Sequence, residues 1–207
     1  MKKCVIITSY IEGNLSSLME GEHPDLILCA DGGYDHAKNV GVTPDFLIGD
    51  FDSLSGSVQP GIETITFPAE KDDTDTGLCL RAAIKQGCDD ILIIGGLGGR
   101  FDHALANVQL MASAADQVTR IAMKDGKNYI TVLKDGQMRV PKKNNAHLSV
   151  LSLSNVSLGV FLEGVKYPLS DYTMTRTFPL GVSNEFAENE ARISVRKGTL
   201  FVALSED

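Results

Sequence analysis

The stretch Phe46-Leu47-Ile48-Gly49-Asp50-Phe51-Asp52-Ser53 decides how the whole chain is interpreted. Its first three residues are a short apolar run that predicts a buried strand, and two carboxylates with one residue between them follow directly. Because residues i and i+2 of an extended chain point to the same side, Asp50 and Asp52 are expected to converge on one point. Carboxylate oxygens suit Mg²⁺, which commonly also holds substrate phosphates. An isolated Asp-x-Asp is equally explained by a polar turn, so the rest of the chain must decide.

Strand and helix patterns alternate over residues 1–124. Two apolar runs, Leu26–Ala30 and Ile91–Ile94, are continuous, as in parallel strands that are covered on both faces. The predicted strands are Cys4–Thr8, Leu26–Ala30, Phe46–Ile48, Ile62–Phe67, Ile91–Ile94 and Val118–Met123. The predicted helices are Tyr34–Val40, Thr74–Gln86 and His103–Ala115. This alternation predicts an α/β N-terminal domain with a mostly parallel sheet and flanking helices.

Helical periodicity ends after Lys124, and short strand-like runs follow at the spacing of hairpins. These runs are Tyr129–Leu133, Gln137–Val140, His147–Leu153, Val156–Leu162, Met174–Phe178, Ala191–Val195 and Leu200–Leu204. Turn signals such as Asp135-Gly136 and Lys197-Gly198 separate them. The pattern predicts a C-terminal all-β sandwich or barrel. We place the two domains at residues 1–130 and 131–207.

Composition limits the function. With 43% hydrophobic and 22% charged residues, the 207-residue chain is able to form a packed core, and its net charge of −8 disfavours nucleic-acid binding through a basic face. No apolar run reaches membrane-spanning length, and the run after Met1-Lys2-Lys3 lacks a small-residue cleavage site. The four cysteines have no Cys-x-x-Cys spacing and are expected to be small buried hydrophobes. These features predict a protein of the reducing cytoplasm.

Acidic and glycine-rich segments follow several of the predicted strands. Asp31-Gly32-Gly33 follows Leu26–Ala30, the Gly95–His103 segment follows Ile91–Ile94, and Lys71–Asp75 precedes a helix. Each has an ordinary alternative as a turn or a helix cap. In parallel sheets, however, ligands bind beyond the carboxyl ends of the strands. Two carboxylates about 5 Å apart repel by roughly 3 kcal/mol at an effective dielectric of 20, so a cluster of these aspartates requires a cation.

The loop Gly95-Gly96-Leu97-Gly98-Gly99-Arg100 lacks the Gly-Lys-Ser/Thr ending of a Walker A motif. Arg100 stands where a phosphate-binding cation is needed, and its planar fork suits phosphate oxygens. Backbone N–H groups, a metal and Arg100 together are able to hold a triphosphate. The alternative for Arg100 is a surface salt bridge.

Four blocks in this order, with one C-terminal loop, resemble the signature of the thiamine pyrophosphokinase family. The four blocks are Asp31-Gly32-Gly33, Gly49-Asp50-Phe51-Asp52-Ser53, Lys71-Asp72-Asp73-Thr74-Asp75 and Gly95 to His103, and the loop is Gly181-Val182-Ser183-Asn184-Glu185-Phe186. The resemblance implies transfer of pyrophosphate from the co-substrate ATP to the thiamine hydroxyl, which gives thiamine diphosphate and AMP. It also implies a homodimer, with a nucleotide-binding catalytic domain and a thiamine-binding sandwich that meet at the subunit interface.

The resemblance further implies roles for individual residues. Mg²⁺ ligands are Asp50, Asp52 and Asp75; catalytic residues are Asp50, Asp52, Arg100 and Asp102; nucleotide contacts are Asp31, Lys71, Thr74, Asp75 and Arg100; thiamine contacts are Asp102, Ser183, Asn184 and Phe201. Asp102 is expected near the thiamine hydroxyl, and Ser183 and Asn184 at the aminopyrimidine, although a hairpin turn also explains these two. Some members stack thiamine on a C-terminal tryptophan, which this chain lacks, so Phe201 is the candidate.

Three other functions remain open from the residues alone. A metal-dependent glycosyltransferase also uses Asp-x-Asp, but it releases a nucleoside diphosphate. A binding module for thiamine or a nucleotide consumes no ATP. A phosphohydrolase makes AMP without thiamine. An assay with ATP, Mg²⁺ and thiamine separates all four functions.

Overall fold

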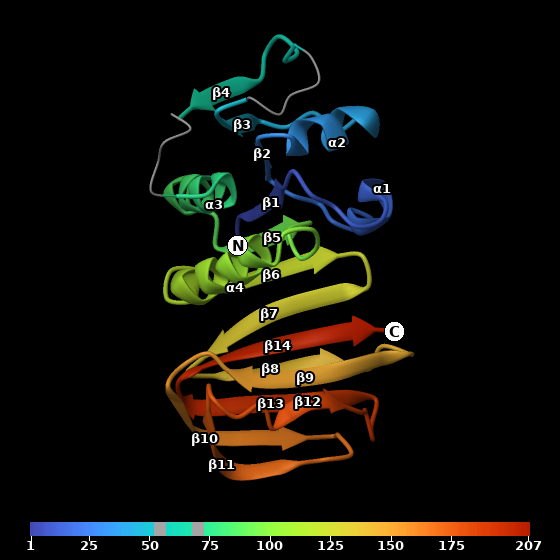
Figure 1. The fold of residues 1–207 in the computed structure, drawn as a ribbon, viewed down its shortest axis with the longest axis vertical. Coiled ribbons are helices and arrows are strands. Elements are labelled where there is room, and N and C mark those ends of the chain that lie inside the picture. The colour runs from blue at the N-terminus through green and yellow to red at the C-terminus, as the bar shows by residue number, and fades with distance from the viewer. Residues whose placement is uncertain (52–56, 68–72) are drawn as a thin grey trace. The chain divides into compact units, whose positions relative to one another are not determined.

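The computed structural model describes residues 1–51, 57–67 and 73–207. The described chain separates into two compact units, Met1–Gly126 and Lys127–Asp207 (Figure 1). Parallel strand pairs occur in unit 1 and antiparallel pairs in unit 2, so the described chain as a whole has mixed strand directions. No helix of the described residues is long and apolar enough to cross a membrane.

Unit 1 alternates strands and helices. Its elements are β1 (Lys3–Ile7), α1 (Leu15–Leu18), β2 (Leu26–Ala30), α2 (Gly33–Asn39), β3 (Phe46–Gly49), β4 (Glu63–Thr66), α3 (Asp75–Lys85), β5 (Asp90–Ile94), α4 (Phe101–Ala114) and β6 (Arg120–Asp125). The strand order is β6-β5-β1-β2-β3-β4, and these neighbours pair in parallel. The predicted α/β unit is confirmed, and these pairs agree with a parallel sheet.

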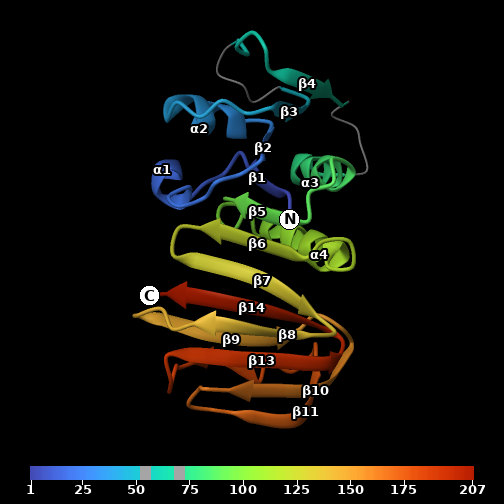
Figure 2. The same cartoon turned by 180° about the vertical axis from the view of Figure 1, so that it is seen from behind.

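The strand order reverses at β1. The chain runs outward from β1 to β4, then returns through α3 to β5 on the other side of β1. Since crossovers between parallel strands are right-handed, this reversal places helices on both faces of the sheet. Accordingly, α1 and α2 lie on one side of the strands, and α3 and α4 on the other (Figures 1 and 2). The covered strands β1 and β5 are almost wholly buried, as their continuous apolar sequences require.

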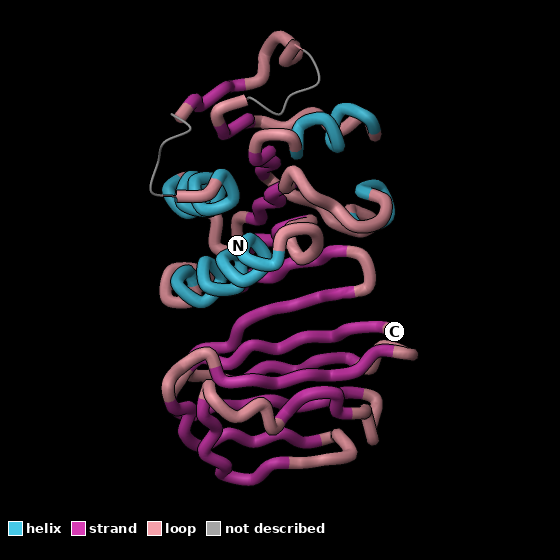
Figure 3. Tube along the Cα trace, viewed as in Figure 1, coloured by secondary structure: helices cyan, strands magenta, loops and turns pink. Residues whose placement is uncertain are grey.

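Unit 2 is built from strands without a helix between residues 127 and 207 (Figure 3). Its strands are β7 (Asn128–Lys134), β8 (Gln137–Pro141), β9 (Ala146–Ser152), β10 (Val156–Glu163), β11 (Leu169–Thr175), β12 (Gly181–Asn184), β13 (Glu190–Lys197) and β14 (Thr199–Glu206). They form the antiparallel orders β12-β9-β14-β7 and β11-β10-β13-β8. Buried side chains of both sets share one core, which confirms the predicted sandwich.

Three short elements differ from the sequence-based prediction. The strand expected at Met174–Phe178 is wrong, because β11 ends at Thr175 and begins at Leu169. β11 is an edge strand with a positive φ of 45° at Asp171 and irregular register, so its sequence alternates poorly. β12 is a second edge strand that was not predicted, and α1 is too short to show helical periodicity.

Candidate active site at the carboxyl edge of unit 1

A cleft of about 650 Å³ lies beyond the carboxyl ends of the unit 1 strands. Segments after β1, β2, β3 and β5 and the first residues of α3 and α4 form its walls. The lining residues are Thr8, Ser9, Tyr10, Ala30, Asp31, Asp50, Asp73, Thr74, Asp75, Thr76, Gly96, Gly98, Gly99, Arg100, His103 and Asn107. This position next to the strand-order reversal is where open α/β sheets bind ligands.

Three of the predicted carboxylates, Asp31, Asp50 and Asp75, line this one cleft. Asp31 is only 6% exposed, and its Oδ1 atom is buried and accepts no hydrogen bond from any described residue. Its backbone has a positive φ of 45°, and its N–H donates to the Ile48 carbonyl at 2.9 Å. A Cβ atom at Gly49 would lie 3.0 Å from the Asp31 Cβ, so the glycine leaves room for this side chain.

The assignment of the metal ligands stays a prediction. Asp52 and the nucleotide contact Lys71 lie outside the described residues. Within the described ranges, no group of three or more His, Cys, Asp or Glu side chains is close enough to hold a metal ion. Nevertheless, the buried Asp31 oxygen without a hydrogen-bond partner, in the cleft that Asp50 and Asp75 also line, is costly without a cation or a donor. Oxygen ligands of this kind fit Mg²⁺.

Thr74 begins α3 as its N-cap, because its Oγ1 accepts the N–H of Gly77 at 3.1 Å. The side chain of the preceding Asp73 forms an ion pair with Arg81 and accepts the N–H of Thr74 at 2.8 Å. A Cβ atom at Gly77 would overlap the Asp73 carboxylate. The cap is therefore Thr74 and not Asp73 or Asp75, which sequence reasoning considered.

The glycine-rich loop lies between β5 and α4. Gly95, Gly96 and Gly99 have φ of 89°, 85° and 70°, which L side chains rarely adopt. The loop is held at Gly96, whose N–H donates to the Tyr10 carbonyl and whose carbonyl accepts from Asn107 Nδ2, both at 2.9 Å. The backbone thus passes close to the cleft in a fixed path.

Asp125, at the end of β6, was missed by the sequence analysis. It is fully buried and accepts three backbone N–H groups: Glu12 on Oδ1 at 2.6 Å, and Leu97 and Gly98 on Oδ2 at 2.8 and 3.2 Å. The signal that could have found it is the pair Asp125-Gly126 after an apolar strand, which repeats the pattern of Asp31-Gly32.

Arg100 lines the cleft, but Asp102 is not among its lining residues. The exposed Arg100 donates from Nε and Nη2 to the Asp102 carboxylate at 3.1 and 2.6 Å. These hydrogen bonds hold the pKa of Asp102 below its usual value and raise the pKa of Arg100. The salt bridge considered from sequence therefore exists, at the start of α4.

Three of the four residues predicted to contact thiamine, Phe201, Ser183 and Asn184, belong to unit 2. Phe201 lies on β14 between the core residues Leu200 and Val202, so it faces the opposite side of the sheet from the sandwich core. Ser183 has a positive φ of 56°, and its N–H donates to Ser149 Oγ at 3.1 Å.

Asn184 is buried and joins two backbone segments. Its Nδ2 donates to the Tyr167 carbonyl at 2.8 Å, and its Oδ1 accepts the N–H groups of Tyr167 and Glu185 at 3.1 and 3.0 Å. These hydrogen bonds fix the path of the loop that follows β12.

Proteins with a strand-end cleft of this kind in a parallel α/β unit typically bind phosphorylated ligands there. The family model for the thiamin pyrophosphokinase catalytic domain matches residues 18–123, and that for its vitamin B1 binding domain matches residues 136–200. The thiamine pyrophosphokinase of Bacillus subtilis is 33% identical over 175 residues, 82% of this chain and 82% of that protein. The chain belongs to the thiamine pyrophosphokinase family, which confirms the resemblance and the prediction of an enzyme.

Two solved structures share the whole fold. The crystal structure of thiamine pyrophosphokinase from Bacillus subtilis aligns with a TM-score of 0.90 at 29% identity and covers 100% of both chains. That of thiamin pyrophosphokinase from Geobacillus thermodenitrificans has a TM-score of 0.86 at 29% identity and covers 99% of this chain and 98% of its own.

Proposed function

We propose that this chain transfers the pyrophosphoryl group of ATP to the hydroxyl of thiamine, with Mg²⁺, and so forms thiamine diphosphate and AMP. The observation that carries the proposal is the single cleft that joins Asp31, Asp50 and Asp75 with the glycine-rich loop and Arg100. Family membership supports thiamine and ATP as substrates. We assign catalysis to residues 1–130 and thiamine binding to residues 131–207.

Asp50, Asp52 and Asp75 are the proposed Mg²⁺ ligands. Mg²⁺ supplies positive charge for the phosphate oxygens of ATP and polarises them. This charge also explains how a chain with a net charge of −8 is able to bind an anionic nucleotide. Asp31 contributes its unsatisfied oxygen to the same cleft and adds negative charge beside the metal ligands.

The start of α4 is the proposed phosphate site. The N–H groups of Leu97 and Gly98 already donate to Asp125. The part of the loop that is proposed to bind phosphate is therefore Gly99 and Arg100, which line the cleft. The Arg100 cap position has no side-chain hydrogen bond, and the dipole of the 14-residue α4 favours an anion there. Thr74 adds the start of α3 on the facing wall.

The transfer itself needs positioning and charge stabilisation more than covalent chemistry. The thiamine hydroxyl oxygen forms a bond to the β-phosphorus in line, while the bond from that phosphorus to the bridging oxygen of AMP breaks. AMP leaves with the electron pair. Asp102 orients the hydroxyl or accepts its proton, and Arg100 stabilises charge on the transferred group. The Arg100–Asp102 hydrogen bonds orient this carboxylate and hold its pKa below the usual value.

Thiamine binding is proposed on the unit 2 sheet. Phe201 faces the same side of this sheet as Ser149, which holds the Ser183 backbone. In this proposal Phe201 stacks on thiamine, and Ser183 and Asn184 hold the aminopyrimidine. The active form is a homodimer, with thiamine between the α/β domain of one subunit and the sandwich of its partner. The four free cysteines agree with a cytoplasmic enzyme.

One assay tests the proposed reaction. The chain is incubated with ATP and Mg²⁺, with and without thiamine, and AMP is measured. AMP that forms only with thiamine supports the proposal. Thiamine-independent AMP indicates a phosphohydrolase, and no AMP with intact ligand binding indicates a binding module. A nucleoside diphosphate released from a nucleotide sugar would indicate a glycosyltransferase.

Asp50→Asn tests the metal assignment. Because catalysis depends on the metal-bound carboxylate, kcat is expected to fall by about a hundredfold or more while the unfolding midpoint changes little. Near-normal turnover of this variant with saturating Mg²⁺ contradicts the assignment of Asp50. The AMP assay and a urea unfolding curve on the same preparation measure both quantities.

A further inference from the structure

The Asp125 side chain connects two loops that lie far apart in the sequence. One is the segment after β1, which donates through Glu12 to Oδ1, and the other is the glycine-rich loop, which donates through Leu97 and Gly98 to Oδ2. The carboxylate is fully buried, so these hydrogen bonds are shielded from water. Charge-assisted bonds of this kind are stronger than those between neutral groups.

Both loops form walls of the cleft. Tyr10 lines the cleft, and its ring lies directly against the glycine-rich loop, because a Cβ atom at Gly98 would overlap the ring. A Cβ atom at Gly99 would lie only 3.1 Å from the same ring. Asp125 therefore sits behind a packed layer, in which the Tyr10 segment and the Gly98–Gly99 segment determine each other's position.

We propose that Asp125 is a positioning residue that fixes both loops, so that Gly99, Arg100 and the start of α4 meet the phosphates of the nucleotide. Asp125 lies outside both segments matched by the family models, 18–123 and 136–200. A carboxylate is needed because each of its two oxygens accepts backbone N–H groups, one from the loop after β1 and the other from the glycine-rich loop. An asparagine presents an NH₂ group to one of the two loops, so one wall loses its anchor while the side-chain volume stays the same. The proposal rests on nucleotide binding in this cleft.

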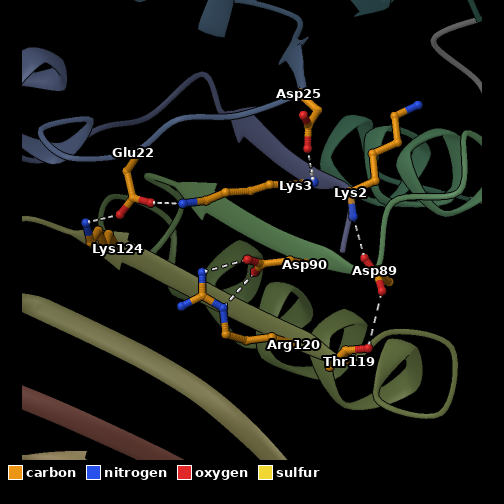
Figure 4. Close-up of polar contacts among 9 residues, drawn as sticks. All are labelled: Lys2, Lys3, Glu22, Asp25, Asp89, Asp90, Thr119, Arg120 and Lys124. Carbon is orange, nitrogen blue, oxygen red and sulfur yellow. Dashed lines mark hydrogen bonds and ion pairs between the residues drawn. The ribbon is translucent and has the colours of Figure 1, made fainter.

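Asp90→Asn is the matched control for Asp125→Asn. Asp90 is a second buried carboxylate, at the opposite end of the neighbouring strand β5, where it accepts from Arg120 Nε at 2.7 Å and Nη2 at 3.1 Å (Figure 4). Both variants lose buried charge-assisted hydrogen bonds and some stability. Only Asp125→Asn disturbs the cleft, so the two variants separate positioning from general destabilisation.

The experiment measures the dissociation constant of Mg·ATP by calorimetry at a temperature where circular dichroism shows each variant folded, together with KM for ATP and kcat. We expect both the dissociation constant and KM for ATP to rise in Asp125→Asn by on the order of ten- to a hundredfold, since small displacements of positioning groups have such effects. Asp90→Asn is expected to stay within about twofold of the unaltered chain.

Equal or tighter Mg·ATP binding by folded Asp125→Asn overturns the proposal, as does an equal loss in Asp90→Asn. If the unaltered chain does not bind Mg·ATP, the proposed function fails instead, which keeps the two failures distinguishable. If Asp125→Asn does not fold, amide hydrogen exchange in the unaltered chain tests the proposal instead. Slow exchange at Glu12, Leu97 and Gly98 that slows further with Mg·ATP supports the proposal, and fast exchange at these amides contradicts it.

Discussion

Asp31→Asn is expected to stabilise the ligand-free chain. The substitution keeps the side-chain shape, and asparagine tolerates the positive φ of 45° at this position. It removes a buried carboxylate whose Oδ1 has no hydrogen-bond partner in the described part of the chain, in the cleft that Asp50 and Asp75 also line. An amide still leaves a buried polar atom without a partner, but burying an unsatisfied charged oxygen costs more than burying a neutral group, by about 1–3 kcal/mol. The other carboxylates of the cleft add repulsion that a neutral amide lacks.

The expected gain is therefore about 1–2 kcal/mol, which raises the midpoint of thermal unfolding by roughly 2–4 °C per kcal/mol for a chain of this size. The same change weakens Mg·ATP binding, because it removes negative charge from the side of the proposed cation. The shift of the midpoint on adding Mg·ATP should shrink accordingly, since ligand stabilisation follows the ratio of ligand concentration to dissociation constant.

Calorimetric unfolding with and without Mg·ATP measures both effects. Asp90→Asn serves as the control, because that carboxylate has its partner Arg120, and its loss is expected to destabilise the chain by about 1–2 kcal/mol. The reasoning is refuted if Asp31→Asn is as destabilised as Asp90→Asn without ligand and keeps the full midpoint shift with Mg·ATP. If Asp31→Asn is stabilised without ligand but its midpoint shifts as much with Mg·ATP as that of the unaltered chain, the repulsion in the cleft is supported. Asp31 then has no part in binding Mg·ATP.

Two further predictions concern ion pairs of unit 1. Arg100→Ala should raise the pKa of Asp102 toward its ordinary value, because the Arg100 hydrogen bonds are the largest cause that lowers it; an unchanged carboxyl titration by NMR would contradict this. Burial of Glu22 acts to raise its pKa, but hydrogen bonds from Lys124 and Lys3 outweigh burial and lower it (Figure 4). The stability that the Glu22 carboxylate contributes is therefore fully present above its ordinary pKa of 4.5 and is lost as the pH falls through the lowered pKa of the folded chain. Glu22→Gln should cost about 1 kcal/mol of unfolding free energy at pH 7 and less near pH 3, and urea unfolding at the two pH values measures the difference.

Unit 1 was predictable because its central strands are covered on both faces. The covered strand β5 is apolar over Ile91–Ile94, so its sequence predicts it, and β2 was predicted with its observed bounds. Edge strands lack this constraint. β11 has one fully buried apolar residue, Met174, and β12 spans four residues with irregular register, so neither shows a clear alternation.

The site was predictable as far as strand direction determines it. Aspartates that end parallel strands meet at one edge, which is how Asp31 and Asp50 could be placed together. Asp102 could not be placed in this way, since its orientation depends on where α4 begins and on its bond to Arg100. The pair Asp125-Gly126 could have marked Asp125 as a candidate, but no local pattern shows its hydrogen bond from Glu12, 113 residues away.

The sign of the Asp125→Asn effect separates two physical contributions to phosphate binding. The buried Asp125 carboxylate accepts from the loop that is proposed to bind the phosphates, so removing its charge would by Coulomb's law alone favour an anion. The three N–H groups that it accepts already offset much of that charge locally, and the same groups fix the loop. Weaker binding after the loss of a negative charge therefore requires that loop geometry outweighs electrostatics. Tighter binding would show the reverse, and the hydrogen bonds of the glycine-rich loop to Tyr10, Asn107 and the Lys124 carbonyl would then be enough to hold its path.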